Sequence, residues 1–306
     1  MKSERAAIFT AADTGVYLVL IGAAFSGLRP LFARLLIDDG LTSVVTALYC
    51  YFGSALIFIP FGIKGMQPGW DHKRAAVLAV ASGLFVGVGG AAYFEALSRL
   101  PVATVTLIYF TYPAWVTVLL AVWRRRWPRR QAWLGVGCVL VGVFLIVGHG
   151  TGALNNPPID FLIAFIAPLS WTVLIIFLGG PLTALKPSSR VGFITLGAVM
   201  TMGLAIMIEQ PPALLARSTA GWISALGLIV ISGIGCHVLT TIGVQKAGSE
   251  RASFAGAFEI ATSLIIGWVI FTEPISLHQV AGVFLIAAAL FYTRRIDVAV
   301  GPKSLH

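Results

Sequence analysis

Long apolar runs alternate with short polar connections along almost the whole chain. A helix rises about 1.5 Å per residue, so about 20 apolar residues are needed to cross a hydrocarbon core about 30 Å thick. Ten runs approach or exceed that length, at residues 15–36, 42–63, 75–97, 101–123, 132–148, 159–180, 190–209, 221–245, 252–272 and 275–293. The pattern predicts an all-α integral membrane protein with ten transmembrane helices.

The composition agrees with this prediction. Of the 306 residues 58% are hydrophobic and only 11% are charged, whereas soluble domains carry roughly 25% charged residues. The chain therefore lacks the polar surface that a soluble receptor or kinase domain needs. The first run begins near Gly15, is too long for a signal-peptide core and is not followed by a small-residue cleavage site, so we interpret it as a retained helix.

The positive charges indicate how the chain is oriented. A net charge of +9 would suggest nucleic acid in a soluble protein, but here the basic residues lie in gaps between apolar runs. We therefore expect no nucleic-acid partner, only contact with anionic lipid. A cytoplasmic N-terminus places seventeen Lys and Arg residues inside and three outside. By the positive-inside rule this predicts a multi-pass protein of the bacterial inner (plasma) membrane with both termini cytoplasmic.

The chain repeats weakly at an offset of about 147 residues. The segment from Pro101 to Gly135 resembles the segment from Gly248 to Gly282, and Ala24–Gly27 resembles Pro168–Trp171. The repeat therefore divides the chain into residues 1–150 and 151–306, the second part ending in a short cytoplasmic tail. Since each repeat holds five helices, an odd number, the second must enter the membrane in the opposite orientation.

The connections between equivalent helices support the inversion. Five arginines lie between the fourth and fifth predicted helices, whereas the matching connection between the ninth and tenth carries no Lys or Arg. Inverted repeats are typical of secondary transporters, whose substrate sites lie near the bilayer midplane between the repeats.

These features resemble the ten-helix EamA-type members of the drug/metabolite transporter superfamily. The motifs that carry the resemblance are Ala96-Leu97, Pro113, Leu134-Gly135, Gly142, Ser170-Trp171, Glu273-Pro274 and Gly282. The chain departs from the family in two places. Trp123–Arg126 replaces the Gly-Glu pair that usually ends the fourth helix, and Glu259-Ile260 stands where the ninth helix often has proline. The resemblance implies transport of amino acids, nucleoside-like metabolites or other small polar solutes, mostly outward.

Charged side chains inside the bilayer cost about 2.5–3.5 kcal/mol or more, so each needs a partner or a purpose. Glu259 is followed at i+3 by Thr262 on the same helical face. It is a candidate for proton coupling or amine binding, or else a neutral side chain bonded to hydroxyls. His237 is a candidate for substrate contact, for pairing with Glu259, or for packing. Arg29, directly before Pro30, is a candidate for bridging a free carbonyl, binding a substrate carboxylate or snorkelling outward.

Other polar and aromatic side chains are less specific. Glu95 and Arg99 are four residues apart and are expected to form an interfacial ion pair, with an outer gate as the alternative. Buried Tyr and Trp tend to face polar space. The aromatic candidates for a cavity lining are Tyr93, Tyr109, Tyr112 and Trp171.

The sequence holds no Walker-type phosphate loop and no metal-binding spacing, so no cofactor or metal is expected and the chain is not interpreted as an enzyme. We predict a secondary active transporter that exports small polar metabolites such as amino acids by alternating access, as a monomer or homodimer, with proton coupling open. The alternatives are an uncoupled channel or facilitator, and an intramembrane enzyme or scaffold.

Overall fold

The computed structural model describes residues 2–65, 69–100, 105, 108–125, 130–147 and 157–262, together with 277, 280–282, 284–285 and 288. Each element in these residues is a helix, which confirms the all-α prediction. The tenth predicted span and the later part of the ninth lie mostly outside the described residues. The count of ten helices and the cytoplasmic termini therefore stay predictions.

Six described spans are long and apolar enough to cross a membrane, and they match the first three predicted runs and the sixth to eighth. They are formed by α1 (Lys2–Gly27) with α2 (Arg29–Asp38), α3 (Ser43–Lys64), α4 (Trp70–Arg99), α8 (Pro158–Leu178), α9 (Pro187–Glu209), and α10 (Thr219–Gly227) with the π-helical segment η3 (Leu228–Gly235) and α11 (Cys236–Ala247). The shorter elements are α6 (Tyr112–Arg124), α7 (Arg130–Val147), the 3-10 turn η2 (Pro181–Ala184) and α12 (Ser249–Gly256).

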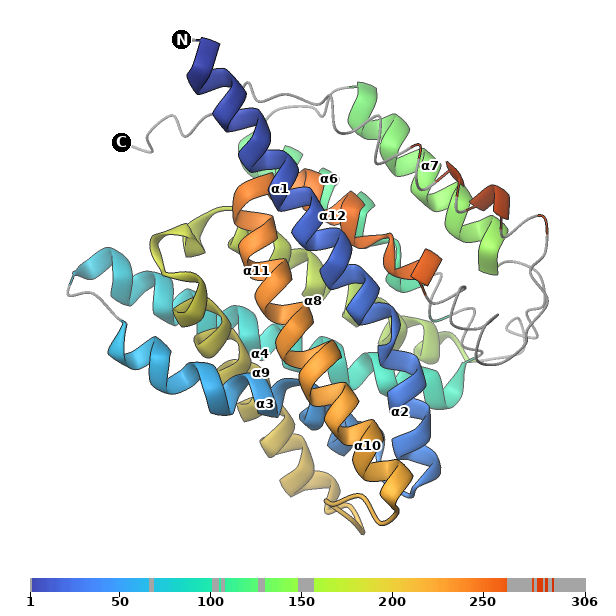
Figure 1. Cartoon of the computed structure of the whole chain (residues 1–306). Coiled ribbons are helices and arrows are strands. Elements are labelled where there is room, and N and C mark those ends of the chain that lie inside the picture. Colours follow the sequence, from blue (N-terminus) through green and yellow to red (C-terminus); the bar gives the residue numbers. More distant parts are fainter. Residues whose placement is uncertain are drawn as a thin grey trace.

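The helices pack in pairs, and the predicted repeat relates each pair to a second pair in which the two halves have changed roles. α1 lies along α11, and α4 lies along α8 (Figure 1). α1 and α8 lie in the first predicted span of their halves, and α4 and α11 lie in the third. Each contact therefore joins the first span of one half to the third span of the other. In the same way α4 contacts α9, while α3 contacts η3, and α3 and α9 pack against each other. This arrangement fits two halves related by a pseudo-twofold axis.

Small residues allow the closest of these contacts. Gly83 and Gly87 of α4 lie directly against Ile194, Ala198 and Thr201 of α9, and a Cβ at either glycine would collide with them. Without a hydrophobic driving force between helices in lipid, close backbone approach of this kind supplies the packing energy. The pair therefore fixes the α4–α9 interface.

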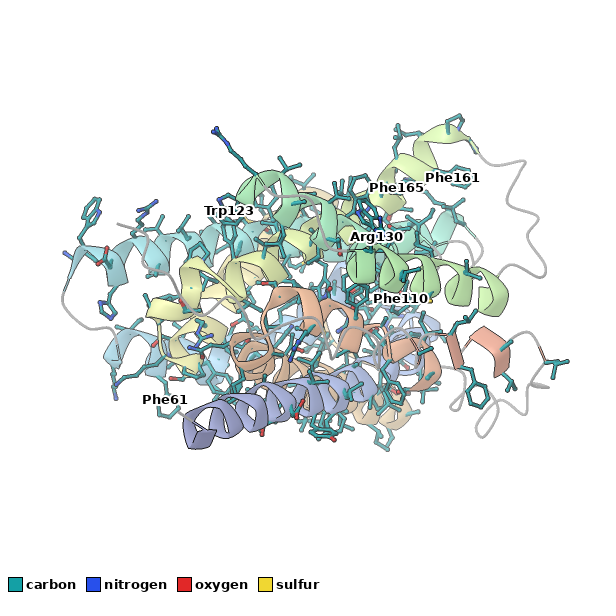
Figure 2. The ribbon with its side chains drawn as sticks, turned by 90° about the horizontal axis from the view of Figure 1, so that it is seen from above. Phe61, Phe110, Trp123, Arg130, Phe161 and Phe165 are labelled. Atoms are coloured by element: carbon teal, nitrogen blue, oxygen red, sulfur yellow. The ribbon has the colours of Figure 1, made fainter. Side chains whose placement is uncertain are left out.

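The outside of the bundle is apolar. Phe61 and Trp123 project from its periphery and are 59% and 56% exposed, whereas Phe110 lies inside (Figure 2). An apolar exterior of this kind suits lipid. α7 lies at the edge of the bundle, where it packs on α6 (Figure 1).

The first span is interrupted next to Arg29. Pro30 has no N–H and so cannot donate to the carbonyl of Ser26 four residues earlier. The Leu28 N–H instead bonds to the Phe25 carbonyl at 3.3 Å, and the helix restarts as α2. The break places Arg29 at the first turn of a new helix, in the interior of the protein.

Two further breaks lie at equivalent positions of the predicted repeat. Turns occur at residues 110–111 and at residues 257–258, which are 147 apart. In each turn a backbone N–H donates to the carbonyl three residues earlier instead of four. The Thr111 N–H donates to the Ile108 carbonyl and the Phe258 N–H to the Ala255 carbonyl, both at 3.1 Å. The first break is followed by Pro113, but Ile260 holds the matching position in the second. The break therefore forms without proline.

Candidate functional site

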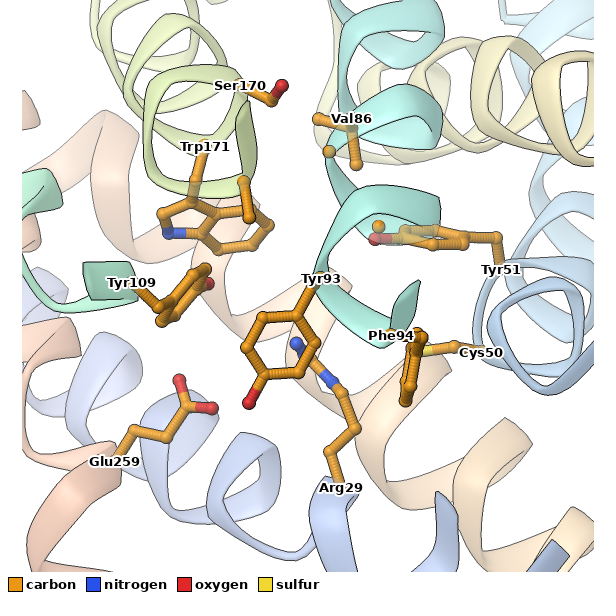
Figure 3. A pocket seen from close by; sticks show the side chains of 13 residues that line it. Arg29, Cys50, Tyr51, Val86, Tyr93, Phe94, Tyr109, Ser170, Trp171 and Glu259 are labelled. Atoms are coloured by element: carbon orange, nitrogen blue, oxygen red, sulfur yellow. The ribbon is translucent and has the colours of Figure 1, made fainter. Parts of the chain in front are cut away.

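A pocket lies where helices of both predicted halves meet (Figure 3). Its cavity volume, counted as the space open to the centres of water molecules, is about 30 Å³. Its lining comes from α2, α3, α4 and α8 and from the segments around the two equivalent breaks. The lining residues are Arg29, Cys50, Tyr51, Val86, Gly89, Gly90, Tyr93, Phe94, Tyr109, Ala167, Ser170, Trp171 and Glu259. We call this space pocket 1.

Arg29 supplies the positive charge of pocket 1. Its side chain points into the pocket beside Tyr93 rather than toward the lipid (Figure 3). One terminal nitrogen lies 4.0 Å from the Cys236 sulfur, a weak contact. The buried Nε has no hydrogen-bond partner among the described residues. A guanidinium carries five N–H donors and has a strong preference for carboxylates, so Arg29 is equipped to bind an acceptor from outside the chain.

Glu259 supplies the negative charge of the same space, where its carboxylate lies beside Tyr93 (Figure 3). It is the first helical residue after the break at 257–258. Its charge interacts with that of Arg29, and the Ser26 hydroxyl lies within hydrogen-bonding reach of its carboxylate. Pocket 1 therefore presents opposite charges to whatever enters it.

Aromatic rings form the walls between the two charges. Tyr93 packs edge-on against Tyr109, with ring centroids 5.3 Å apart, and Trp171 faces them from α8 (Figure 3). Five of the residues predicted for the site thus line pocket 1: Arg29, Tyr93, Tyr109, Trp171 and Glu259. Sequence reasoning missed Cys50, Tyr51 and Ser170. Only Ser170 had a signal, since it belongs to the repeated Ser170-Trp171 motif.

A second pocket, pocket 2, shares the Trp171 and Glu259 wall with pocket 1. It is lined by Val19, Ala23, Ser26, Tyr112, Trp171, Ile175, Cys236, Thr240, Ala252, Gly256 and Glu259. The predicted residue Tyr112 lies here, where its hydroxyl donates to the Ser253 carbonyl at 2.8 Å. Pocket 2 lies between α1, α8 and α11.

His237 and Thr262 line neither of these pockets. The His237 ring stacks on Tyr51 with centroids 5.1 Å apart, and its Nδ1 lies 3.2 Å from the Ser54 hydroxyl. It therefore supports a pocket residue from behind. Thr262 packs on Gly27, the last residue of α1, where an added Cβ would come within 2.8 Å of the Thr262 Cβ.

The ion pair predicted between Glu95 and Arg99 is present, with nitrogen and oxygen 2.6 Å apart. Arg99 also reaches Asp160 of α8 at 3.4 Å, a partner that the sequence did not reveal. The cluster ties the C-terminal end of α4 to the start of α8. Both Arg99 and Glu95 are nearly half exposed, so we expect a modest stabilising effect.

Arg190 is the most deeply buried charge in the described chain, with no exposed surface. Its Nε donates to the Leu185 carbonyl at 3.0 Å, and its terminal nitrogens donate to the Thr241 carbonyl at 3.5 Å and to the Gln245 side chain. The sequence indicated only a cytoplasmic positive charge here. The structure shows a bridge from α9 to α11.

Comparison with known proteins decides the class of molecule. A model of the EamA-like transporter family matches residues 13–148 and again residues 159–295. The chain belongs to the EamA-like transporter family. This membership confirms the resemblance drawn from the sequence and makes the chain a multi-pass membrane transporter, rather than an enzyme, for a small-molecule substrate.

Relatives of the EamA-like chain carry similar names. An uncharacterized transporter of Archaeoglobus fulgidus is 26% identical over 239 residues, which cover 78% of this chain and 82% of that protein. A second one from that organism is 24% identical over 283 residues, covering 92% and 96%. An uncharacterized transporter of Synechocystis sp. is 27% identical over 226 residues, covering 69% of this chain and 65% of that protein.

One protein of known crystal structure shares the EamA-like fold of this chain. The two superpose with a TM-score of 0.74 at 16% sequence identity, over 94% of this chain and 99% of the other. At that identity the likeness shows the fold alone.

Proposed function

We propose that this transporter is a secondary active exporter of small zwitterionic metabolites, with amino acids as the substrate class, and that it works by alternating access. The observation that carries the proposal is the Arg29 guanidinium, directed into a pocket between the two halves with a buried Nε that no described residue satisfies. A buried guanidinium with one unsatisfied nitrogen favours a ligand that brings its own carboxylate.

Glu259 gives the ligand a second point of attachment. Its carboxylate lines the same pocket as Arg29, so it can pair with the ammonium group of the same zwitterion. When no substrate is bound, protonation neutralises a carboxylate in a low-dielectric site. Glu259 therefore carries the proton in a proton-coupled cycle, with substrate and proton exchanging at one group.

The test is counterflow in proteoliposomes with a panel of radiolabelled amino acids, amines and carboxylic acids, with and without a pH gradient. Saturable counterflow of amino acids supports a carrier. Flux that neither saturates nor shows counterflow supports an uncoupled channel and contradicts the proposal.

Arg29→Ala tests the carboxylate contact. One charge-assisted hydrogen-bond pair contributes about 1.5–3 kcal/mol, so apparent affinity for amino acids should fall about 10-fold to 100-fold, while simple amines are less affected. Arg125→Ala removes an exposed arginine outside both pockets and serves as the matched control. Equal losses for amines and amino acids in Arg29→Ala would refute the carboxylate contact.

Glu259→Gln tests the coupling. The variant should insert normally and lose the acceleration of transport by a pH gradient. Glu209→Gln changes an exposed carboxylate at the end of α9 and provides the comparison. Unchanged, pH-dependent export in Glu259→Gln would remove Glu259 from the mechanism.

The proposal includes a bacterial inner membrane location with both termini cytoplasmic, and a site enclosed within one chain. Mapping of sided accessibility should find residues 124–130 in the cytoplasm and residues 273–278 on the opposite face. If both stretches react from one side, the inverted arrangement is wrong.

A further inference from the structure

Pockets 1 and 2 are built from equivalent positions of the two halves. In the sixth and first spans the offset is 144 residues, which relates Ala167 to Ala23 and Ser170 to Ser26. In the other spans it is 147, which relates Gly89 to Cys236, Tyr93 to Thr240, Tyr109 to Gly256, and Tyr112 to Glu259. The first residue of each of the first five pairs lines pocket 1, and its partner lines pocket 2. The last pair lies together in pocket 2. Five lining positions of pocket 1 thus correspond, under the predicted repeat, to lining positions of pocket 2.

The two pockets differ in charge. Pocket 1 contains Arg29 and Glu259. Pocket 2 shares Glu259, and none of its described lining residues is Lys, Arg or His. Arg29 reaches this pocket only through the 4.0 Å contact of one terminal nitrogen with the Cys236 sulfur. Its other polar groups are hydroxyls and a thiol, among them Ser26 and Thr240, and its shared wall includes the Trp171 indole. A carboxylate, hydroxyl oxygens and an aromatic face together suit an ammonium group, whereas the Glu259 charge repels a second carboxylate.

The pockets also lie toward opposite ends of the spans. Pocket 1 draws Gly89, Gly90 and Tyr93 from the second half of α4, which ends at Arg99. Pocket 2 draws Thr240 from α11, which ends at Ala247. By the charge distribution the end of α4 faces outward and the end of α11 faces the cytoplasm. The shared wall of Trp171 and Glu259 separates an outward space from an inward one.

We infer that pocket 2 is a second substrate half-site, selective for the ammonium end of the substrate and reached from the cytoplasmic side, whereas pocket 1 is reached from the outside. The inference rests on the proposed function and adds to it the site from which an exported molecule starts. A zwitterion is held by its ammonium group in pocket 2 and acquires its carboxylate contact with Arg29 on passing to pocket 1.

The native thiols allow a direct test, because Cys50 lines pocket 1 and Cys236 lines pocket 2. Three single-thiol variants retain Cys50, Cys236 or Cys138, with the other two cysteines replaced by Ala. Cys138 of α7 lines neither pocket and reports background reactivity. Each variant is treated with a membrane-impermeant methanethiosulfonate in right-side-out and in inside-out vesicles. We expect Cys236 to react from the cytoplasmic face and Cys50 from the outer face.

Two simple probes then test selectivity. With n-butylammonium at about ten times its Kd, modification of Cys236 should slow about tenfold, while butyrate at the same concentration should have little effect there. Butyrate should instead protect Cys50. Modification of both thiols from one face, or equal protection of both by n-butylammonium, overturns the inference. So does a Cys236 that reacts from the cytoplasmic face no faster than Cys138.

The repeat offers a matched pair of variants. Ser26→Ala in pocket 2 should weaken protection of Cys236 by n-butylammonium severalfold, and its counterpart Ser170→Ala in pocket 1 should leave it unchanged. Equal effects of the two serines contradict a separate half-site. None of these assays requires transport. If the thiols behave as expected but amino acids show no counterflow, the half-site stands and the proposed substrate class falls.

Discussion

Tyr112 and Glu259 stand 147 residues apart, and each is the first helical residue after the turn that interrupts its span. Both line pocket 2, so the two interruptions present a polar side chain to the same space. A break in a membrane helix is tolerated where the freed backbone groups face protein or a polar cavity. The break and the pocket therefore depend on each other in both halves.

Gly256, one turn before Glu259, leaves the space that the Tyr112 hydroxyl occupies. A Cβ at this position would collide with the Tyr112 hydroxyl, which donates to the Ser253 carbonyl. We predict that Gly256→Ala destabilises the protein by about 1–3 kcal/mol, as overpacking does, and impairs counterflow. Thermal unfolding in detergent measures the first effect. Gly203→Ala in α9, where an added Cβ has no neighbour within 4 Å, should be neutral or stabilising.

Proline should be tolerated at position 260 better than inside a regular helix. The break at 257–258 already resembles the one before Pro113, and the Ile260 N–H makes an i−3 bond of 3.2 Å to Ala257. Ile260→Pro removes that bond, at a cost of about 1 kcal/mol, whereas proline inside a regular helix costs about 3 kcal/mol or more. Ala198→Pro, inside the uninterrupted α9, is the comparison. Melting temperatures that fall equally in both variants would show that the second break is not a preformed turn.

Arg190 should stabilise the junction of α9 and α11. Arg190→Ala removes the donors to the Leu185 carbonyl and to the Gln245 side-chain oxygen. Each buried group left unsatisfied costs about 1–3 kcal/mol, so the melting temperature should drop clearly. Lys186→Ala, an exposed cation in the same segment, is expected to change it little. A drop of similar size in both variants would mean that surface charge, and not the buried bridge, is what matters.

Asp39 should make the stability of the folded protein depend on pH in the acidic range. Its carboxylate accepts the Arg217 N–H at 2.6 Å and the Ser218 N–H at 3.2 Å. Hydrogen bonding by Ser218 and then by Arg217 lowers its pKa. A lowered pKa in the folded state stabilises the protein above the unfolded value of about 3.9, and this stabilisation is lost as the pH falls through the folded pKa.

The measurement for Asp39 is thermal stability between pH 7 and pH 3. Asp39→Asn should melt below the wild type at neutral pH, and the two curves should converge below about pH 4. Asp38→Asn, the exposed neighbour, should stay close to the wild type throughout. A constant difference between Asp39→Asn and the wild type would contradict the role of the carboxylate.

Much of the fold is predictable from the sequence because lipid imposes a simple rule of length and apolarity. Six predicted runs match described spans, and the Glu95–Arg99 pair followed from helical spacing alone. The break before Glu259 was not predictable, since Ile260 carries no backbone signal. The Arg99–Asp160 contact was missed because it joins residues 61 apart on different helices.

Only some lining residues of the candidate site were predicted from the sequence. Whether a residue was predicted depended on its type. Charges within apolar runs are conspicuous, so Arg29 and Glu259 were identified, and the structure brings them to one pocket. Cys50 is an ordinary packing residue in the sequence and becomes a lining residue only through the crossing of α3, α4 and α8. His237 was conspicuous for the same reason as the charges, yet it lies behind Tyr51. Rarity in an apolar run identifies a buried polar group but does not say which way it faces.

Trp171 and Glu259 serve both pockets, so a molecule seated in one takes side chains away from the other. Solute accumulated on one face of the membrane should then slow uptake from the opposite face, as trans-inhibition. Two molecules cannot queue in single file through such a protein. Each cycle of the proposed carrier is then limited to one substrate molecule.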